Sequence, residues 1–375
     1  MDKSRHPLSH SRQQYVEPEA VKALAKSSGL KLLLAGGPRL GDLLFAFPAI
    51  DYLLHCGMVK DLSVLCYGYA APLLAGINGT AGCVIMPEHS WNIFDRWRTI
   101  RSINQQKFDL AVVFNGKRSA RELLAATNIP AILIEQPGLA QKAAQHLHTA
   151  MQAFPQASAA AEPAAAIPSL RVAKEALTWA QGMLSGIDPP IIAFHVGCQR
   201  VSRKHLSFEQ INHTATKVWL VERYLELGRL IIEQLEATVL LVGSGGSERF
   251  LAEEFVKRLG PRCKSAVDWG DCMQTAALLK HCRALVASDS GILHLASAVG
   301  LKAVALWGPT PIEMFAPMAA PGTIKILHKD VDCSPCRKRQ CGNKICLSSI
   351  SAKEVFEALL ELTVDNRPHC CATAD

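Results

Sequence analysis

The sequence predicts an α/β protein with two doubly wound domains, each built on a parallel sheet between layers of helices. Three observations support this prediction. Apolar segments of strand length alternate with segments of helical period from residue 31 to residue 362. The strand segments are continuously apolar, which indicates burial on both faces and therefore parallel strands. The length of 375 residues suits two hydrophobic cores rather than one.

The first domain is expected at residues 31–170, after an N-terminal extension of residues 1–30. Its strands are expected at 31–36, 61–68, 83–87, 108–116 and 131–136, and its helices at 41–57, 94–106 and 119–128. The Ala/Pro-rich run at 152–170 has no clear periodicity and is the expected linker.

The second domain is expected at residues 171–375. Its strands are expected at 190–197, 238–245, 284–290 and 302–308, and its helices at 221–235, 247–260, 274–282, 292–300 and 351–362. Ser351 and Glu354 have the spacing of a capping box at the last helix. Two Rossmann-like domains of similar size are expected to face each other across a cleft, with ligands at the carboxyl ends of the strands.

The composition limits the class of protein. The formal net charge of +7 suits an acidic substrate or an anionic membrane surface, or it serves solubility alone, and no nucleic-acid-binding motif is found. The first twenty residues lack the apolar core of a secretory signal. No apolar run reaches the ~20 residues of a spanning helix. We expect a cytoplasmic protein, without a disulfide framework among its thirteen cysteines.

The stretch "ALVASDSGILHLASAVG" places polar residues where a strand passes into a helix. Asp289, Ser290 and Gly291 stand at this junction, and His294 follows one turn later. Free N–H groups at a helix start bind phosphate, and glycine permits close approach. Alternatively, Asp289 or Ser290 merely caps the helix and His294 is a core residue. The segments "VGSGGSERF" and "FHVGCQR" form similar loops at the same edge.

The loop "AGGPRLGD" opens the first domain in the same way, and Asp42 lies at the start of its helix. A carboxylate on the cleft side can act as a general base. The alternative is a structural carboxylate, which is electrostatically favoured in the first turn of a helix.

Four cysteines near the C-terminus have the spacing C-x2-C-x4-C-x4-C: Cys333, Cys336, Cys341 and Cys346. Four thiolates at such spacing can hold zinc or iron in a tetrahedral site. The alternative is a set of free thiols in a loop rich in lysine and arginine.

Five blocks together resemble glycosyltransferase family 9, the ADP-heptose:lipopolysaccharide heptosyltransferases of the GT-B fold. They are "GDLLFAFPAI", "HVGC", "KVWLVERYLELGRLI", "SDSGILHLASAVGLKAVALWGPT" and "CSPCRKRQCGNKICL". The resemblance covers roughly residues 31–362. It implies an inverting transferase whose nucleotide-sugar donor lies in the second domain and whose acceptor contacts the first.

The resemblance also implies roles for individual residues. Asp42 falls on the family's catalytic base, and the diphosphate-binding block falls on Asp289, Ser290, Gly291, Ile292 and His294. The lysine of the family's K-x-W-P element falls on Lys217, with Leu220 in place of proline, and Lys204 is its rival. Glu248 is the candidate for the acidic contact to the donor's ribose or base.

No D-x-D element stands in a convincing place, so turnover is expected to need no divalent cation or other cofactor. Some family members carry cysteines at the place of the cluster here, and a subset that modifies autotransporter proteins binds iron there. The resemblance therefore keeps a structural zinc or iron open for the four cysteines.

The expected acceptor is the polyanionic inner core of lipopolysaccharide, for which the candidate contacts are Arg39, Lys117, Arg118 and Arg121. Each of these side chains alone also fits a solvated surface. Because such an acceptor belongs to a membrane lipid, the sequence leaves open that the protein associates peripherally with the inner face of the inner membrane. Three alternatives are a protein hydroxyl as acceptor, a nucleotide-sugar-binding protein without turnover, and an epimerase of the same fold, against which the sequence blocks argue.

Overall fold

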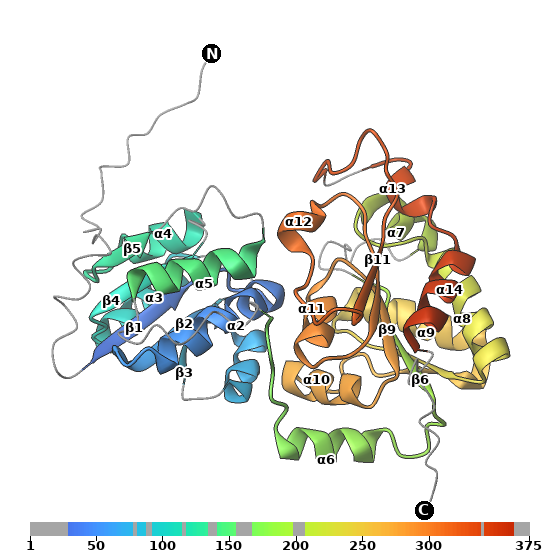
Figure 1. The fold of residues 1–375 in the computed structure, drawn as a ribbon, viewed down its shortest axis with the longest axis horizontal. Coiled ribbons are helices and arrows are strands. Elements are labelled where there is room, and N and C mark those ends of the chain that lie inside the picture. The colour runs from blue at the N-terminus through green and yellow to red at the C-terminus, as the bar shows by residue number, and fades with distance from the viewer. Residues whose placement is uncertain are drawn as a thin grey trace, which may run out of the picture. The chain divides into compact units, whose positions relative to one another are not determined.

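The computed structural model describes residues 29–77, 81–87, 92–114, 118–133, 141–154, 167–197, 207–338 and 341–363. The chain divides into two compact units, which lie within residues 1–171 and 172–375. Each unit is built on a sheet whose neighbouring strands are all parallel (Figure 1). No helix in the described ranges is long and apolar enough to span a membrane.

The first unit has a five-stranded sheet in the order β3-β2-β1-β4-β5. The strands are β1 (Leu30–Ala35), β2 (Val59–Tyr67), β3 (Ala81–Met86), β4 (Leu110–Val113) and β5 (Ala131–Leu133). Strands β2 and β3 lie on one side of β1, and β4 and β5 lie on the other. The strand order therefore reverses between β1 and β4, which is where such sheets open a ligand site at their carboxyl ends.

Helices of the first unit position its loops. They are α2 (Leu40–His55), α3 (Ile93–Gln105), α4 (Arg118–Leu124) and α5 (Lys142–Ala153), together with the 3₁₀ segment η1 (Gly68–Gly76). Helix α2 packs along α5, whereas α3 and α4 contact each other. Buried side chains of α3 and α4, such as Ile103 and Leu123, share one hydrophobic cluster with Leu33 and Ala35 of β1.

The second unit has a six-stranded sheet in the order β11-β10-β9-β6-β7-β8. The strands are β6 (Ile191–His195), β7 (Thr238–Leu241), β8 (Cys263–Ser265), β9 (Ala284–Ser288), β10 (Ala303–Leu306) and β11 (Ile324–Leu327). The order reverses between β6 and β9. The loops after these two neighbouring strands therefore diverge at one point of the sheet edge.

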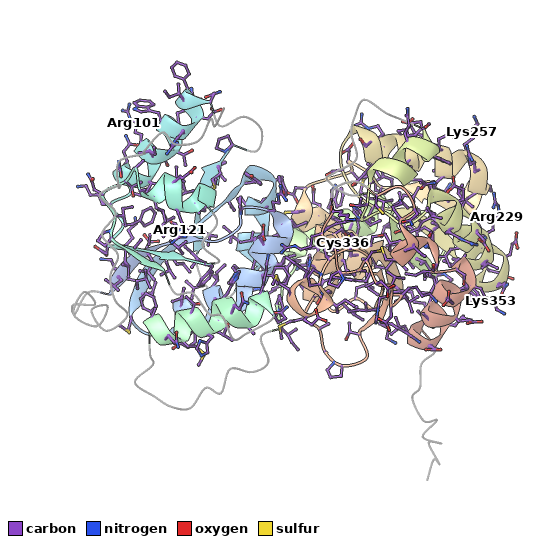
Figure 2. All side chains as sticks on the ribbon, turned by 90° about the horizontal axis from the view of Figure 1, so that it is seen from above. Arg101, Arg121, Arg229, Lys257, Cys336 and Lys353 are labelled. Atoms are coloured by element: carbon purple, nitrogen blue, oxygen red, sulfur yellow. The ribbon has the colours of Figure 1, made fainter. Side chains whose placement is uncertain are left out.

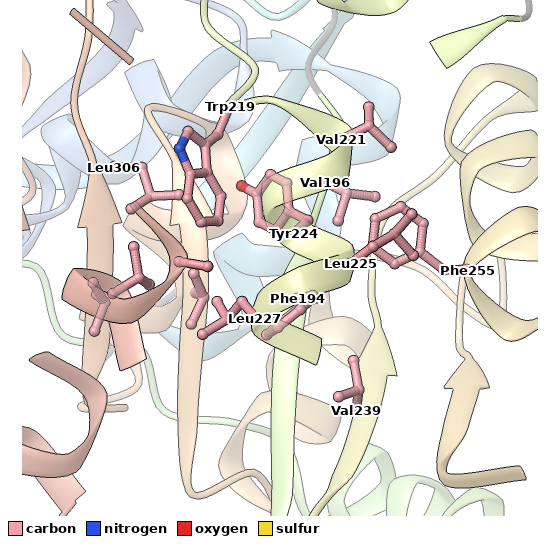
Figure 3. Close-up of a cluster of buried hydrophobic side chains, with 14 of the residues drawn as sticks. Phe194, Val196, Trp219, Val221, Tyr224, Leu225, Leu227, Val239, Phe255 and Leu306 are labelled. Carbon is pink, nitrogen blue, oxygen red and sulfur yellow. The ribbon is translucent and has the colours of Figure 1, made fainter. Parts of the chain in front are cut away.

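Helices α8, α9 and α14 pack together against one side of this sheet, and α10 and α11 contact each other near β9. Their bounds are α6 (Lys174–Met183), α7 (Phe208–Thr214), α8 (Val221–Leu235), α9 (Gly246–Leu259), α10 (Cys272–Lys280), α11 (Gly291–Ala298), α12 (Ile312–Phe315), α13 (Ile345–Ser348) and α14 (Ala352–Thr363). Figure 3 shows the core under α8, where Trp219 and Tyr224 pack with Phe194 and Leu306.

The capping box predicted at the last helix is confirmed. Glu354 N–H donates to Ser351 Oγ at 3.1 Å, and Ser351 N–H donates to the Glu354 carboxylate at 2.8 Å. Hydrogen bonds from Lys329 and from Ser351 lower the pKa of Glu354 to about 2. Helix α8 also has the predicted bounds, 221–235.

Several elements were not predicted. Helix α5 buries a face made mostly of small or polar residues, which gives a weak hydrophobic signal, and it extends to Ala153, inside the expected linker. Of that linker, residues 155–166 lie outside the described residues. Strands β8 and β11 are three and four residues long. Both are edge strands that are not continuously apolar, with the sequences CKS and IKIL, so sheet pairing and not local pattern defines them.

Candidate functional site

The centre of the site in the second unit is the carboxylate of Asp289, which follows β9 directly. Asp289 is 8% exposed, and its Oδ2 accepts a hydrogen bond from Thr310 Oγ1 at 2.7 Å and pairs with the Lys217 ammonium. A buried carboxylate requires such donors because burial removes its water. Thr310 was not predicted as a site residue.

Ser290 is the N-cap of α11, and its Oγ accepts from Leu293 N–H at 3.4 Å. Ser290 is thus the cap, and Asp289 is not. Gly291 and Ile292 form the first turn and are partly exposed, whereas His294 is 7% exposed. The helix therefore presents its first turn at the edge of the sheet, beside the Asp289–Lys217 pair.

Lys217 lies in the short connection between α7 and α8, which Trp219 holds in place. Trp219 N–H donates to Ser288 Oγ at 3.3 Å, and its indole N–H donates to the Ile350 carbonyl at 3.1 Å. Leu220, where the family pattern has proline, is the N-cap of α8 with φ −61° and ψ 130°. Proline adopts the same backbone angles, so the substitution keeps the local geometry.

The loop that carries the four cysteines forms hydrogen bonds with the residues next to Lys217 in the sequence. Lys344 is 2% exposed, and its Nζ donates to the carbonyls of Val218 at 2.9 Å and Ala215 at 3.4 Å. Thr216 Oγ1 donates to the Lys338 carbonyl at 3.1 Å. The cysteine loop is therefore hydrogen-bonded to both sides of Lys217, a contact for which the sequence gives no signal.

A second carboxylate, Glu248, lies in the first turn of α9 after β7. Its Oε2 accepts from Ser244 N–H at 2.8 Å, and its Oε1 lies 3.3 Å from Nε2 of His195 at the end of β6. A Cβ atom at Gly197 or Gly243 would collide with this carboxylate. The glycines of both loops therefore make room for Glu248, and His195 is its unforeseen partner.

One nitrogen of the buried His195 ring faces Glu248. The ring is 5% exposed, and Nδ1 has no hydrogen-bond partner within the described ranges. A buried N–H without an acceptor is costly. Nε2, 3.3 Å from Glu248 Oε1, is the ring nitrogen placed to donate a hydrogen bond to this carboxylate.

The loop beside Glu248 is fixed by Asp268. The Asp268 carboxylate accepts from Gly245 N–H at 2.7 Å and from Arg249 Nη2 at 2.6 Å. Burial acts to raise the pKa of Asp268, but these donors outweigh it and the pKa is lowered. Asp268 therefore stays ionised and holds the glycine-rich turn after β7.

In the first unit, Asp42 is the third residue of α2, whose N-cap is Arg39. Asp42 therefore stands in the first turn and is not the N-cap, so a general base and a structural carboxylate both stay predictions for it. Its Oδ1 lies 3.7 Å from Nζ of Lys142 on α5, and the two side chains are 14% and 13% exposed. A Cβ atom at Gly37 would collide with the Asp42 carboxylate. Lys142 was not foreseen because α5 itself was not predicted.

The structure describes the candidate acceptor contacts only in part. Arg39 is exposed, and Arg121 on α4 is half-buried. Arg118 begins α4, but its side chain lies outside the described set, as do Lys117 and Lys204 entirely. Arg39 follows β1 and Arg121 follows β4, so both stand beyond the strands where the order reverses.

The four cysteines of the C-terminal loop differ in exposure. Cys333 is exposed, Cys336 and Cys341 are half-buried, and Cys346 is 7% exposed. Burial raises the pKa of Cys346, and the three other thiols act in the same direction. In the described part of the chain, however, no three His, Cys, Asp or Glu side chains are grouped to hold a metal ion. This geometry does not fit a four-thiolate site.

Comparison with known families identifies the class of protein. The model described as "Glycosyltransferase family 9 (heptosyltransferase)" matches residues 96–346, more than half of the chain. The chain therefore belongs to glycosyltransferase family 9, as the sequence blocks indicated.

Curated relatives agree with this family. The chain is 22% identical over 322 residues to lipooligosaccharide heptosyltransferase 2 of Haemophilus ducreyi, covering 79% of this chain and 88% of the relative. It is 25% identical over 130 residues to the protein of that name from Campylobacter jejuni, covering 33% and 41%. In this second match, the chain spans about two fifths of the relative's length.

Solved structures share the fold. The Escherichia coli ADP-heptose lps heptosyltransferase II matches with a TM-score of 0.69 at 18% identity, covering 89% of this chain and 98% of that one. A family 9 glycosyl transferase from Veillonella parvula matches with a TM-score of 0.71 at 17% identity, covering 89% and 97%. The two parallel α/β units are therefore those of a GT-B fold.

The thiols are expected to react in the order of their exposure. Iodoacetamide attacks thiolates, so Cys333 should be alkylated first and Cys346 last, because burial raises the pKa of Cys346. Peptide mass spectrometry over time measures the order. Equal rates for Cys333 and Cys346 would contradict the structure. Joint protection that a chelator removes, with about one zinc or iron per chain, would instead establish a metal site.

Replacement of Lys344 should destabilise the second unit. Lys344→Met leaves the carbonyls of Ala215 and Val218 buried without their donor, which should lower the free energy of unfolding by ~1–3 kcal/mol. Chemical denaturation measures the change. The control is Lys353→Met, whose side chain is exposed on α14. Equal stability of the two variants would show that the Lys344 contacts do not support the loop.

Proposed function

We propose that this protein is an inverting glycosyltransferase that transfers heptose from ADP-heptose to the inner core of lipopolysaccharide. The observation that carries the proposal is the pairing of Lys217 with buried Asp289 beside the first turn of α11. The family match supports it. Relatives named lipooligosaccharide heptosyltransferase 2 support the choice of sugar and acceptor.

The diphosphate of the donor would bind at the start of α11. Free backbone N–H groups and the helix dipole favour an anion there, and Gly291 leaves room for close approach. The Lys217 ammonium, held by Asp289, is preorganised to stabilise the charge on the departing diphosphate. His294, in the second turn, completes this group in the proposal. The residues assigned to donor binding are Lys217, Glu248, Asp289, Ser290, Gly291, Ile292 and His294.

Glu248 would bind the ribose of the donor. Each of its oxygens already lies near one protein donor, Ser244 N–H or His195 Nε2, and a carboxylate oxygen can accept a second hydrogen bond. Two neighbouring hydroxyls match two such oxygens. His195 would act as a positioning residue that fixes the carboxylate plane.

Asp42 would be the general base. It takes the proton of the acceptor hydroxyl while that oxygen attacks the anomeric carbon from the face opposite the diphosphate. The bond from the anomeric carbon to the diphosphate oxygen breaks, and ADP leaves with the electron pair. Lys142, 3.7 Å from Asp42, interacts favourably with the ionised carboxylate that a base requires. Arg39, Lys117, Arg118 and Arg121 would contact anionic groups of the acceptor.

In this mechanism, Lys217 and the N–H groups of α11 provide the charge stabilisation of the leaving group. Turnover is therefore proposed to proceed without an added divalent cation, and no step passes through the cysteine loop. That loop acts on the site structurally, because Lys344 and Lys338 contact the residues that flank Lys217.

Asp42→Asn should remove activity without removing the fold. The amide keeps the size of the side chain but lacks a basic oxygen, so kcat should fall by ~10²–10⁴-fold, with donor affinity little changed. Steady-state kinetics, ADP titration and melting temperature give the three readouts. The matched control is Asp51→Asn on the exposed side of the same helix. Full activity with a lowered melting temperature would reduce Asp42 to a structural residue.

Lys217→Ala should weaken ADP binding by ~10–100-fold, because one charge-assisted contact to the diphosphate is lost. Isothermal titration with ADP is the measurement, and the control is Lys257→Ala, which replaces an exposed lysine of α9. Unchanged affinity in Lys217→Ala, with a loss of affinity in Lys204→Ala, would transfer the role to Lys204.

His294→Ala should lower the affinity for ADP in the same assay without unfolding the chain.

A further inference from the structure

Helix α3 of the first unit exposes three large apolar side chains near its N-terminal end. The exposed fractions are 77% for Ile93, 74% for Phe94 and 56% for Trp97. Half of the large exposed hydrophobic side chains in the described residues belong to this single turn and a half of helix. Side chains of this size are normally buried, and a group of them marks an interaction surface.

These side chains share one face of the helix with two arginines. Ile93, Trp97 and Arg101 follow each other at intervals of four residues, as do Phe94 and Arg98 in the neighbouring row. The five residues form what we call the α3 face. The Arg101 guanidinium lies over the Trp97 ring, 5.2 Å from its centre. Figure 2 shows Arg101 at the periphery of the first unit.

The opposite side of α3 fixes the helix to the unit. Thr99 and Ile103 are buried, and Ile103 belongs to the cluster under β1 and β4. Arg96 Nη2 donates to the Glu122 carbonyl of α4 at 3.1 Å, and Asn92 caps the helix by accepting from Asp95 N–H at 2.8 Å. The helix is thus held without the α3 face, which is available for a partner.

The positive charge of α3 indicates which class of partner the α3 face can bind. Helix α3 carries three arginines and one acid, Asp95, which a helical projection places about 160° from Trp97. The α3 face itself therefore carries apolar and cationic side chains and no acidic one. Trp and Phe side chains that insert among headgroups, flanked by arginines that pair with phosphates, are the features of a helix that lies in an anionic bilayer surface.

We propose that the α3 face docks on the surface of a membrane that contains anionic phospholipid. Ile93, Phe94 and Trp97 insert at the level of the headgroups, and Arg98 and Arg101 pair with lipid phosphates. The proposal stands on the exposure and charge of α3 and does not require the transferase activity. An acceptor carried by a lipid would lie at the same surface.

The test is co-sedimentation of the full chain with vesicles. The wild type should bind vesicles of phosphatidylglycerol mixed with phosphatidylcholine, bind vesicles of phosphatidylcholine alone far less, and lose binding as salt rises. Phe94→Ala combined with Trp97→Ala should weaken binding at least about tenfold. Arg98→Gln combined with Arg101→Gln should weaken it about 25-fold, from about fivefold for each arginine.

Two double variants on the second unit are the matched controls. The first control, Met183→Ala with Ile345→Ala, removes two exposed apolar side chains. The second control, Arg229→Gln with Lys257→Gln, removes two exposed cations, and Figure 2 labels these two residues. These controls should bind like wild type. Melting temperatures of all variants establish that the chains are folded.

Three results would overturn the proposal. The first is absence of wild-type binding to the anionic vesicles. The second is binding that the α3 variants and the controls change equally. The third is self-association of the wild type, measured by sedimentation velocity, that the α3 variants abolish while vesicles are not bound. This last result would assign the α3 face to a second copy of the chain.

Discussion

The ion pair between Lys217 and Asp289 is the interaction on which the proposed donor site depends. Asp289 is buried at the end of β9, so its charge requires donors, and Lys217 and Thr310 supply them from two other loops. The pair thereby joins the connection before α8, the turn after β9 and the loop after β10. Trp219 and Lys344 hold the Lys217 connection from the core side. The cysteine loop, which looks separate in the sequence, is consequently part of this support.

A second constraint, the close approach of a carboxylate to the backbone, shapes the other loops at the sheet edges. Glu248 fits only because Gly197 and Gly243 lack side chains. Asp42 likewise fits only because Gly37 lacks a side chain. Each carboxylate then meets a basic or polar partner from a neighbouring element, His195 in the second unit and Lys142 in the first. Parallel sheets bring such loops to one edge, which explains why residues far apart in sequence form these pairs.

Much of the architecture could be predicted from the sequence, because buried parallel strands and amphipathic helices leave strong local patterns. Helix α8 and the turn at residues 289–291 are examples. The partners of the site residues could not be predicted. Lys344 is an ordinary lysine in a basic loop until tertiary packing buries it against two carbonyls. Lys142 lies on a helix whose buried face consists mostly of small or polar residues, which gives a weak hydrophobic signal. The family pattern pointed to Asp289 and to Lys217, with Lys204 as its rival, but it gave no sign that Lys217 and Asp289 form a pair.

Heptose transfer to the inner core of lipopolysaccharide is the proposed reaction, and analysis of the product tests this proposal. Purified protein would be incubated with ADP-heptose and a heptose-deficient lipopolysaccharide core, with mass spectrometry of the core and measurement of released ADP. The core should gain the mass of one heptose, and ADP should appear in equal amount. Release of ADP only when a protein acceptor is present, or no release with either acceptor, would contradict the proposal.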